Sequence, residues 1–165
     1  MRHFLKLTDL NREEIISILE KAKDIKEKPT DYSSVLKDKT LLMMFEKPSL
    51  RTRISFEVGM TQMGGHAIFY DLKDSVLGKK ETVSDAAKTV SRYIDVIMAR
   101  LYSQDMIEEL AESSDVPVIN GLTDMYHPCQ ILADLFTIKE KLGKIEGLKV
   151  AYIGDANNNV THSFI

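Results

Sequence analysis

Hydroxyl and guanidinium side chains are concentrated directly after an apolar run of the chain. Residues 41–45 are all hydrophobic, and Ser49, Arg51, Thr52 and Arg53 follow within eight positions. The apolar run predicts a buried strand, and Pro48 predicts a sharp turn behind it. If a helix begins in this segment, these side chains meet its free N–H groups at the positive end of the helix dipole. The segment therefore predicts a phosphate site, the alternative being an ordinary helix start with solvated arginines.

Further polar residues follow other apolar runs. Arg100 comes directly after one, and His127 and Gln130, three apart, flank the start of a long amphipathic segment. Ligands of parallel α/β sheets bind outside the carboxyl ends of the strands, so these positions are candidates for chemistry. Each also has an ordinary interpretation: Arg100 as a surface residue, His127 as a helix cap, and Cys129 as packing. The polar loop 154–159 is a candidate second wall of a cleft, or a plain loop.

Alternating strand-like and helix-like segments would position these residues. Asn11 and Glu14 predict a capping box at the start of an N-terminal helix. Short apolar runs predict strands at 40–45, 66–70, 94–99, 116–119 and 148–153, and amphipathic segments predict helices near 81–93, 103–113 and 128–142. This order predicts an α/β fold with a parallel sheet and helices on both faces.

Residues 54–60 do not fit this scheme by periodicity. Ile54, Phe56, Val58 and Met60 alternate with less apolar residues, which taken alone favours a strand. We nevertheless predict a helix there, because a phosphate site after the turn requires one.

Composition limits the possible classes of protein. With 165 residues and 44% hydrophobic content, the chain can bury one core. A net charge of −3 gives no general attraction to nucleic acid or to an anionic membrane. The single cysteine excludes an internal disulfide and a multi-cysteine metal site. We expect a cytoplasmic protein, because the sequence has neither a membrane-spanning segment nor a signal-peptide pattern.

The last part of the sequence predicts the start of another unit. We expect one domain at 1–143 and the beginning of a second α/β domain at 147–165, with the second domain truncated.

The motifs taken together resemble the aspartate/ornithine carbamoyltransferase family. The resemblance covers nearly the whole chain, in order, and matches the first half of the family's fold. The matching segments are FEKPSLRTRISFE at 45–57, GGH at 64–66, Gly78 with Glu81 and Thr82, MARL at 98–101, VPVING at 116–121, HPCQILAD at 127–134 and residues 154–163.

The resemblance implies transfer of a carbamoyl group from carbamoyl phosphate to the side-chain amine of ornithine, giving citrulline and phosphate. It implies no metal and no organic cofactor, and assembly into trimers with shared active sites. It assigns catalysis to Arg100, His127 and Thr52, ornithine binding to Asn159, and carbamoyl phosphate binding to Ser49, Leu50, Arg51, Thr52, Arg100, His127, Pro128, Cys129 and Gln130.

Two residues depart from the family pattern. Leu50 stands where a threonine is usual, which removes a hydroxyl but keeps the backbone N–H. Val76 stands where a polar residue is often lent to the neighbouring subunit. The sequence resembles the ornithine branch more than the aspartate branch, while putrescine and modified ornithines stay open as acceptors. A fragment that binds carbamoyl phosphate without turnover is the alternative to an enzyme.

Overall fold

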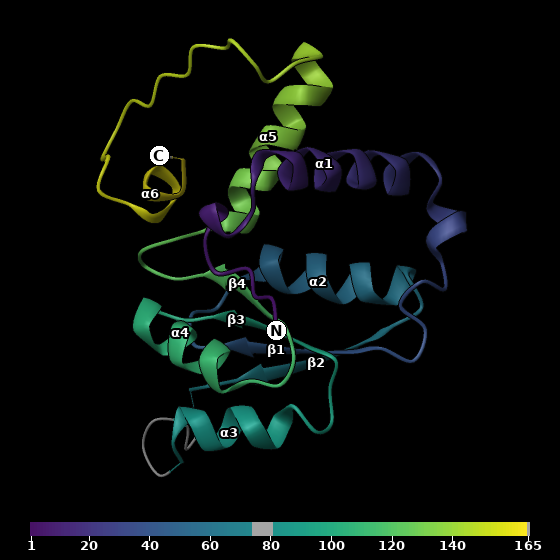
Figure 1. Ribbon diagram of the computed structural model, residues 1–165, viewed down its shortest axis with the longest axis vertical. Coiled ribbons are helices and arrows are strands. Elements are labelled where there is room, and N and C mark those ends of the chain that lie inside the picture. The colour runs from purple at the N-terminus through teal and green to yellow at the C-terminus, as the bar shows by residue number, and fades with distance from the viewer. Residues whose placement is uncertain (74–80, 165) are drawn as a thin grey trace.

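A four-stranded parallel sheet forms the centre of the protein in a computed structural model that describes residues 1–73 and 81–164 (Figure 1). The strand order is β2-β1-β3-β4. The predicted parallel sheet is confirmed, with strand ends displaced by up to three residues from the apolar runs. The strands are β1 (Thr40–Phe45), β2 (His66–Asp71), β3 (Val96–Arg100) and β4 (Val118–Leu122).

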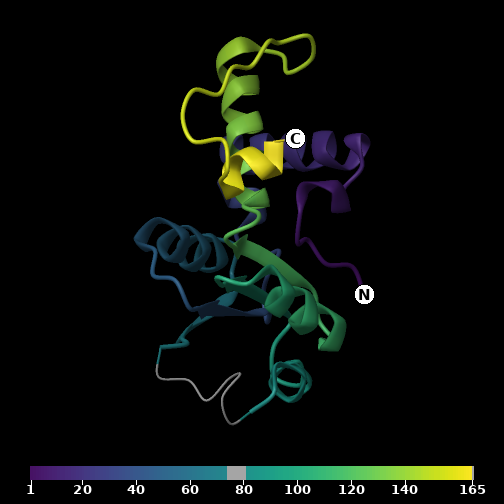
Figure 2. The same ribbon diagram turned by 90° about the vertical axis from the view of Figure 1, so that its left-hand side faces the viewer.

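Helices cover both faces of this sheet, as predicted (Figures 1 and 2). Of the helices that pack on the sheet, α2 lies on one side and α3 and α4 lie on the other. The described helices are α1 (Arg12–Glu27), α2 (Leu50–Gln62), α3 (Val83–Val90), α4 (Gln104–Ser113), α5 (Pro128–Leu142) and α6 (Asn159–Phe164), with short 3-10 turns η1 (Leu7–Asp9) and η2 (Pro29–Tyr32).

Two apolar clusters explain why β1 is hydrophobic at nearly every position. Leu42 and Met44 belong to the cluster formed with α3 and α4. Met43 and Phe45 belong to the cluster on the α2 side, where Met60 packs. Successive side chains of a strand point to opposite faces, so a strand covered on both faces has to be apolar throughout.

The segment with the strand-like alternation is helical, which confirms the predicted helix. The Ser49 side chain caps α2 by accepting a hydrogen bond from the Thr52 N–H. Met60 is buried, whereas Ile54 and Val58 are exposed on the outer side of the helix. The alternation of apolar residues was therefore misleading, because only part of it faces the core.

The predicted strand at 148–153 is wrong. These residues form neither strand nor helix, and the Ile153 side chain is 96% exposed. A strand needs a neighbour to satisfy its backbone N–H and C=O groups, and no other described segment pairs with this one. The helix before it, α5, ends as predicted at Gly143, which takes the left-handed conformation of a C-cap with φ 74°. The division into domains at 143–147 stays a prediction.

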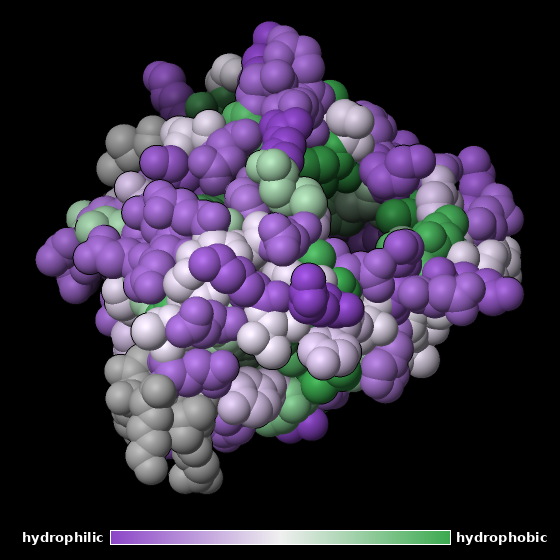
Figure 3. All heavy atoms as spheres, turned by 60° about the horizontal axis from the view of Figure 1, so that its bottom comes forward, coloured by the Kyte–Doolittle hydropathy of each residue, from purple (hydrophilic) through white to green (hydrophobic). Residues whose placement is uncertain are grey.

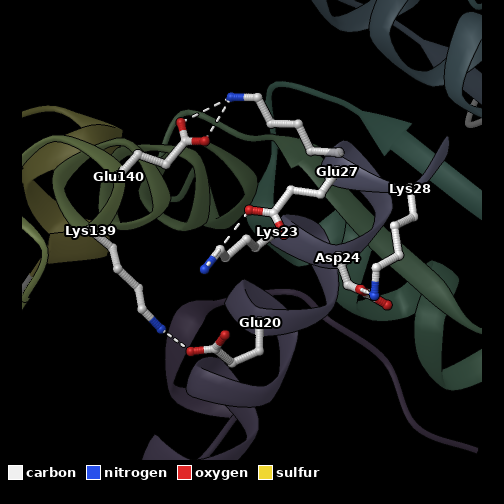
Figure 4. Close-up of polar contacts among 8 residues, drawn as sticks. Glu20, Lys23, Asp24, Glu27, Lys28, Lys139 and Glu140 are labelled. Atoms are coloured by element: carbon white, nitrogen blue, oxygen red, sulfur yellow. Dashed lines mark hydrogen bonds and ion pairs between the residues drawn. The ribbon is translucent and has the colours of Figure 1, made fainter.

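Ion pairs join α1 to α5 beside the sheet (Figure 4). Lys26 and Glu140 pair at 2.7 Å, and Lys139 pairs with Glu20.

Helix α1 begins with the predicted capping box, in which the side chains of Asn11 and Glu14 each accept the other residue's backbone N–H. Hydrophilic and apolar side chains are interspersed on the face seen from the α3 side (Figure 3). Val76 and Gly78, singled out in the sequence, lie outside the described residues.

Candidate active site

The candidate residues gather at the carboxyl ends of β1, β3 and β4. Here β4 carries an extra residue, because Ala99 pairs with Asn120 whereas Arg100 pairs with Leu122. The extra residue is Gly121, where a Cβ atom would come within 2.4 Å of the Met98 sulfur and 3.3 Å of the Ala99 carbonyl oxygen. Such a bulge redirects the strand end, and bulges are common beside active sites.

A hydrogen-bonded chain of three side chains links β3 to the start of α2. Arg100 Nη1 donates to Thr52 Oγ1 at 3.4 Å, and Ser49 Oγ lies 3.0 Å from the same Thr52 oxygen. Arg100 Nε donates to the carbonyl of Lys47 at 3.1 Å, which fixes the guanidinium against the turn before α2. The structure thus brings together Ser49, Thr52 and Arg100, which the sequence offered as separate candidates. Their roles toward a ligand stay predictions.

The arginines around this helix start have different surroundings. Burial lowers the pKa of Arg100, and the positive charge of Arg51 lowers it further. The two positive charges repel each other, so an anion bound between the two guanidiniums would stabilise both. Arg53, in contrast, pairs with Glu57 at 3.1 Å and stacks over the Phe69 ring at 3.8 Å. Arg53 therefore belongs to the side of α2 near β2 and does not join the other two.

A cavity of about 350 Å³ adjoins the start of α2. Leu50, the first residue of the helix, is 73% exposed and lines this cavity. The cavity lining includes residues of β2 and does not include Arg100. Its lining consists of Phe45, Pro48, Ser49, Leu50, Arg53, Phe69, Asp71 and Lys73.

His127 precedes α5 and caps it through the backbone. Its carbonyl accepts the N–H of Gln130 at 3.1 Å. Burial, and then the charge of Arg100, lower the pKa of the imidazole to about 4, against an opposing effect of Asp134. The ring is therefore neutral at pH 7 and can donate or accept a hydrogen bond without a charge. Its Nδ1 atom is buried without a partner in the part of the chain that the structure describes.

The residues that follow His127 in the sequence have different surroundings. Pro128 is buried at the first helical position, as its ring geometry favours. The exposed Gln130 side chain donates to Asp134 at 3.0 Å, four residues further along α5. Cys129 donates to the carbonyl of Asn120 at 3.3 Å, and burial raises the pKa of its thiol to about 12. This agrees with the packing interpretation of the cysteine.

Asn159 begins α6 and is turned toward the loop before α5. Its Nδ2 atom donates to the carbonyl of Thr123 at 2.8 Å. The structure thus brings Asn159 to the same edge of the sheet as His127, while its assignment to ornithine stays a prediction.

Sequence reasoning missed a second bridge across this edge. Lys47 pairs with Asp124 at 3.1 Å and lies over the Tyr102 ring, 5.2 Å from its centre. Glu46 accepts the backbone N–H of Tyr102 at 2.9 Å. Only the positions of these residues in the sequence could have indicated the bridge. Glu46 and Lys47 directly follow β1, and Tyr102 follows closely after β3, so all three lie at the ligand-binding edge.

The described residues contain neither a metal-ligating cluster nor a membrane-spanning helix. Within residues 1–73 and 81–164, His, Cys, Asp and Glu side chains form no group of three that could hold a metal ion. In the same part of the chain, the helices are too short or too polar to cross a membrane.

Comparisons with known proteins point to one family. The family model described as "Aspartate/ornithine carbamoyltransferase, carbamoyl-P binding domain" matches residues 2–140. The chain is 53% identical to the ornithine carbamoyltransferase of Bacillus subtilis, covering 99% of this chain and 50% of that protein.

Solved structures agree with the sequence comparison. The ornithine carbamoyltransferase from Pyrococcus furiosus matches with a TM-score of 0.94 and 51% identity, over 99% of this chain and 52% of that one. The enzyme from Burkholderia thailandensis matches with a TM-score of 0.94 and 48% identity, over 99% and 57%. The chain thus spans about half the length of the curated relatives it matches.

Proposed function

The chain belongs to the aspartate/ornithine carbamoyltransferase family, and we propose that it supplies the carbamoyl phosphate site of an ornithine carbamoyltransferase. The proposed reaction transfers the carbamoyl group of carbamoyl phosphate to the side-chain amine of ornithine, giving citrulline and phosphate. The observation that carries this proposal is the chain of hydrogen bonds from Arg100 through Thr52 to Ser49 at the start of α2, beside the charge of Arg51.

The phosphate group would bind at the start of α2. The first N–H groups of a helix have no partner within the helix, and they lie at the positive end of its dipole. The backbone of Leu50 and Arg51 contributes two such groups, so an N–H remains available where the family's usual threonine is absent. The Ser49 and Thr52 hydroxyls and the Arg51 guanidinium complete a site suited to a phosphate dianion.

Arg100 and His127 would act on the carbamoyl carbonyl. As the amine adds, negative charge develops on the carbonyl oxygen, and fixed hydrogen-bond donors stabilise it. Arg100 is held by Lys47 and Thr52 before substrate arrives, so little reorganisation is needed. His127 is neutral because its pKa is about 4, so it contributes a hydrogen bond and adds no second charge. Phosphate then leaves into the arginine-lined site.

The acceptor and the assembly are parts of the same proposal. The similar proteins from Bacillus subtilis and Pyrococcus furiosus carry the name ornithine carbamoyltransferase, which supports ornithine over putrescine, modified ornithine or aspartate. We also propose a domain boundary at 143–147, completion of the amino-acid site by a second domain, trimeric assembly and a cytoplasmic location. A module that binds carbamoyl phosphate without turnover is the second candidate, since the chain matches only half of each relative.

Calorimetry with carbamoyl phosphate, together with a citrulline assay, tests the proposal. Carbamoyl phosphate should bind the chain more tightly than inorganic phosphate, and Arg100→Ala should abolish that preference. Arg92→Ala is a matched control, because Arg92 is exposed at the opposite end of β3. Binding with citrulline formation supports the enzyme, and binding alone supports the module. Equal affinity for both ligands in the unmutated chain would refute the carbamoyl phosphate site.

A further inference from the structure

Helix α6 contacts the segment 123–127 that leads into His127. The contacts fall on every second residue of this segment, and they come from one face of the helix, since residues three and four apart are neighbours there. They are Asn159 Nδ2 to the Thr123 carbonyl at 2.8 Å, His162 Nδ1 to the Met125 carbonyl at 3.3 Å, and the His127 N–H to Ser163 Oγ at 2.8 Å.

The Ser163 hydroxyl acts both as acceptor and as donor in this contact. It accepts the His127 N–H and donates its own proton to the carbonyl of Asn159 at 2.7 Å. Ser163 is 5% exposed, so water cannot readily replace the serine as partner of that N–H. The hydrogen bond within α6 also fixes the direction in which the hydroxyl presents its acceptor lone pair.

The other side of the segment is fixed by α4. Thr123 is fully buried, and its hydroxyl donates to Gln104 Oε1 at 2.8 Å while accepting the Tyr126 N–H at 3.0 Å. The Thr123 N–H closes the turn by donating to the Tyr126 carbonyl at 2.8 Å. The turn before His127 is therefore held by α4 on one side and by α6 on the other.

These bonds determine the direction of the His127 side chain. The peptide group before His127 is fixed by Ser163, and the peptide group after it is fixed by the first turn of α5, where the His127 carbonyl accepts from Gln130. Hydrogen bonds to both flanking peptide groups restrict φ and ψ of His127, which are −139° and 66°. The Cα–Cβ direction follows from the backbone, so these bonds fix the point from which the ring extends.

We infer that Ser163 is a positioning residue for His127, which it acts on by fixing the His127 backbone N–H. This role rests on the proposed function, in which the neutral His127 ring contacts the carbamoyl group. It also couples α6 to the site, because a displacement of α6 would release the peptide group on which the ring direction depends.

Two variants of α6 separate positioning from general disturbance of the helix. Ser163→Ala removes the acceptor of the His127 N–H. Thr161→Val is the matched control, because the Thr161 hydroxyl is also buried on α6 but has no hydrogen-bond partner among the described residues. Hydrogen exchange of the His127 amide, the pH titration of its ring by NMR, and calorimetry with carbamoyl phosphate are measured on all three proteins.

We expect Ser163→Ala to speed exchange of the His127 amide at least tenfold and to move the ring pKa upward toward its ordinary value. Carbamoyl phosphate affinity should fall about fivefold to tenfold, as for loss of one buried hydrogen bond. Thr161→Val should change none of the three. Wild-type values in Ser163→Ala, or equal changes in both variants, would overturn the inference.

The unmutated chain provides a further test that does not depend on the stability of the variant. If the His127 amide exchanges at the rate of an unprotected amide there, the inference fails. Failure of the unmutated chain to bind carbamoyl phosphate would refute the proposed function instead, while exchange and ring titration would still decide the role of Ser163.

Discussion

The folded protein should lose stability as pH falls through the range in which an ordinary histidine takes up a proton, because His127 resists protonation. The pKa of the His127 ring is lowered from 6.5 to about 4 by burial and by Arg100. In the unfolded chain this ring binds a proton below about pH 6.5, whereas in the folded chain it stays neutral down to about pH 4. The free energy of unfolding therefore falls with pH across this window and levels off below it.

The magnitude follows from the size of the pKa shift. One pH unit over which only the unfolded state binds the proton changes the free energy of unfolding by about 1.36 kcal/mol. Between pH 6.5 and 4.5 the unfolded ring goes from half to fully protonated, while the folded ring stays mostly neutral. The His127 contribution to stability should thus fall by about 2 kcal/mol over that interval.

Urea unfolding at several pH values measures this contribution by difference. His127→Gln keeps a polar side chain but does not titrate, so its stability should vary with pH by about 2 kcal/mol less than that of the unmutated chain. His3 and the carboxylates contribute equally to both proteins and cancel. His66→Gln is the control, since His66 is an exposed histidine in β2. Parallel pH profiles for His127→Gln and the unmutated chain would show that the ring is not held neutral by its surroundings.

Three further predictions follow from the structure. Arg51→Ala should weaken carbamoyl phosphate binding by about 2 kcal/mol, or roughly thirtyfold, in calorimetry, and unchanged affinity would refute the phosphate site. Asn11→Ala should lower the free energy of unfolding by about 1 kcal/mol in urea titration, because it removes the cap of α1, and an unchanged value would contradict the cap. Cys129 should react very slowly with a disulfide reagent at pH 8 and rapidly in urea, since its thiol pKa is about 12; equal rates would disprove its burial.

The sequence predicted the sheet well because the sheet is covered on both faces. Buried parallel strands are apolar almost throughout, so β1 and β3 stand out from their surroundings. The predicted strand at 148–153 failed for the opposite reason. Its residues are as apolar as those of a strand, but strand formation depends on a partner distant in the sequence, which composition does not reveal.

The candidate site was predictable where it depends on strand ends and less so where it depends on side-chain direction. Arg100 and His127 were found because polar residues follow apolar runs at the ligand-binding edge. The different surroundings of Arg51 and Arg53 depend on the rotation of α2, which places one beside Arg100 and the other over Phe69. The role inferred for Ser163 has no local signal, because its partner is 36 residues away.

Because of the bulge at Gly121, the number of residues from the start of β4 to His127 matters for the position of His127 as much as which residues they are. A bulge takes up one extra residue without shifting the pairing on either side of it, and it bends the strand at that point. Leu122 and Thr123, which follow the extra residue, are both buried, one in the strand and one just after it. Deleting Gly121 alone would leave Asn120 and Leu122 consecutive opposite Ala99 and Arg100, and would remove the bend with which β4 leads into the segment 123–127. A natural variant that lacks one residue at this position would need different contacts to hold the segment 123–127.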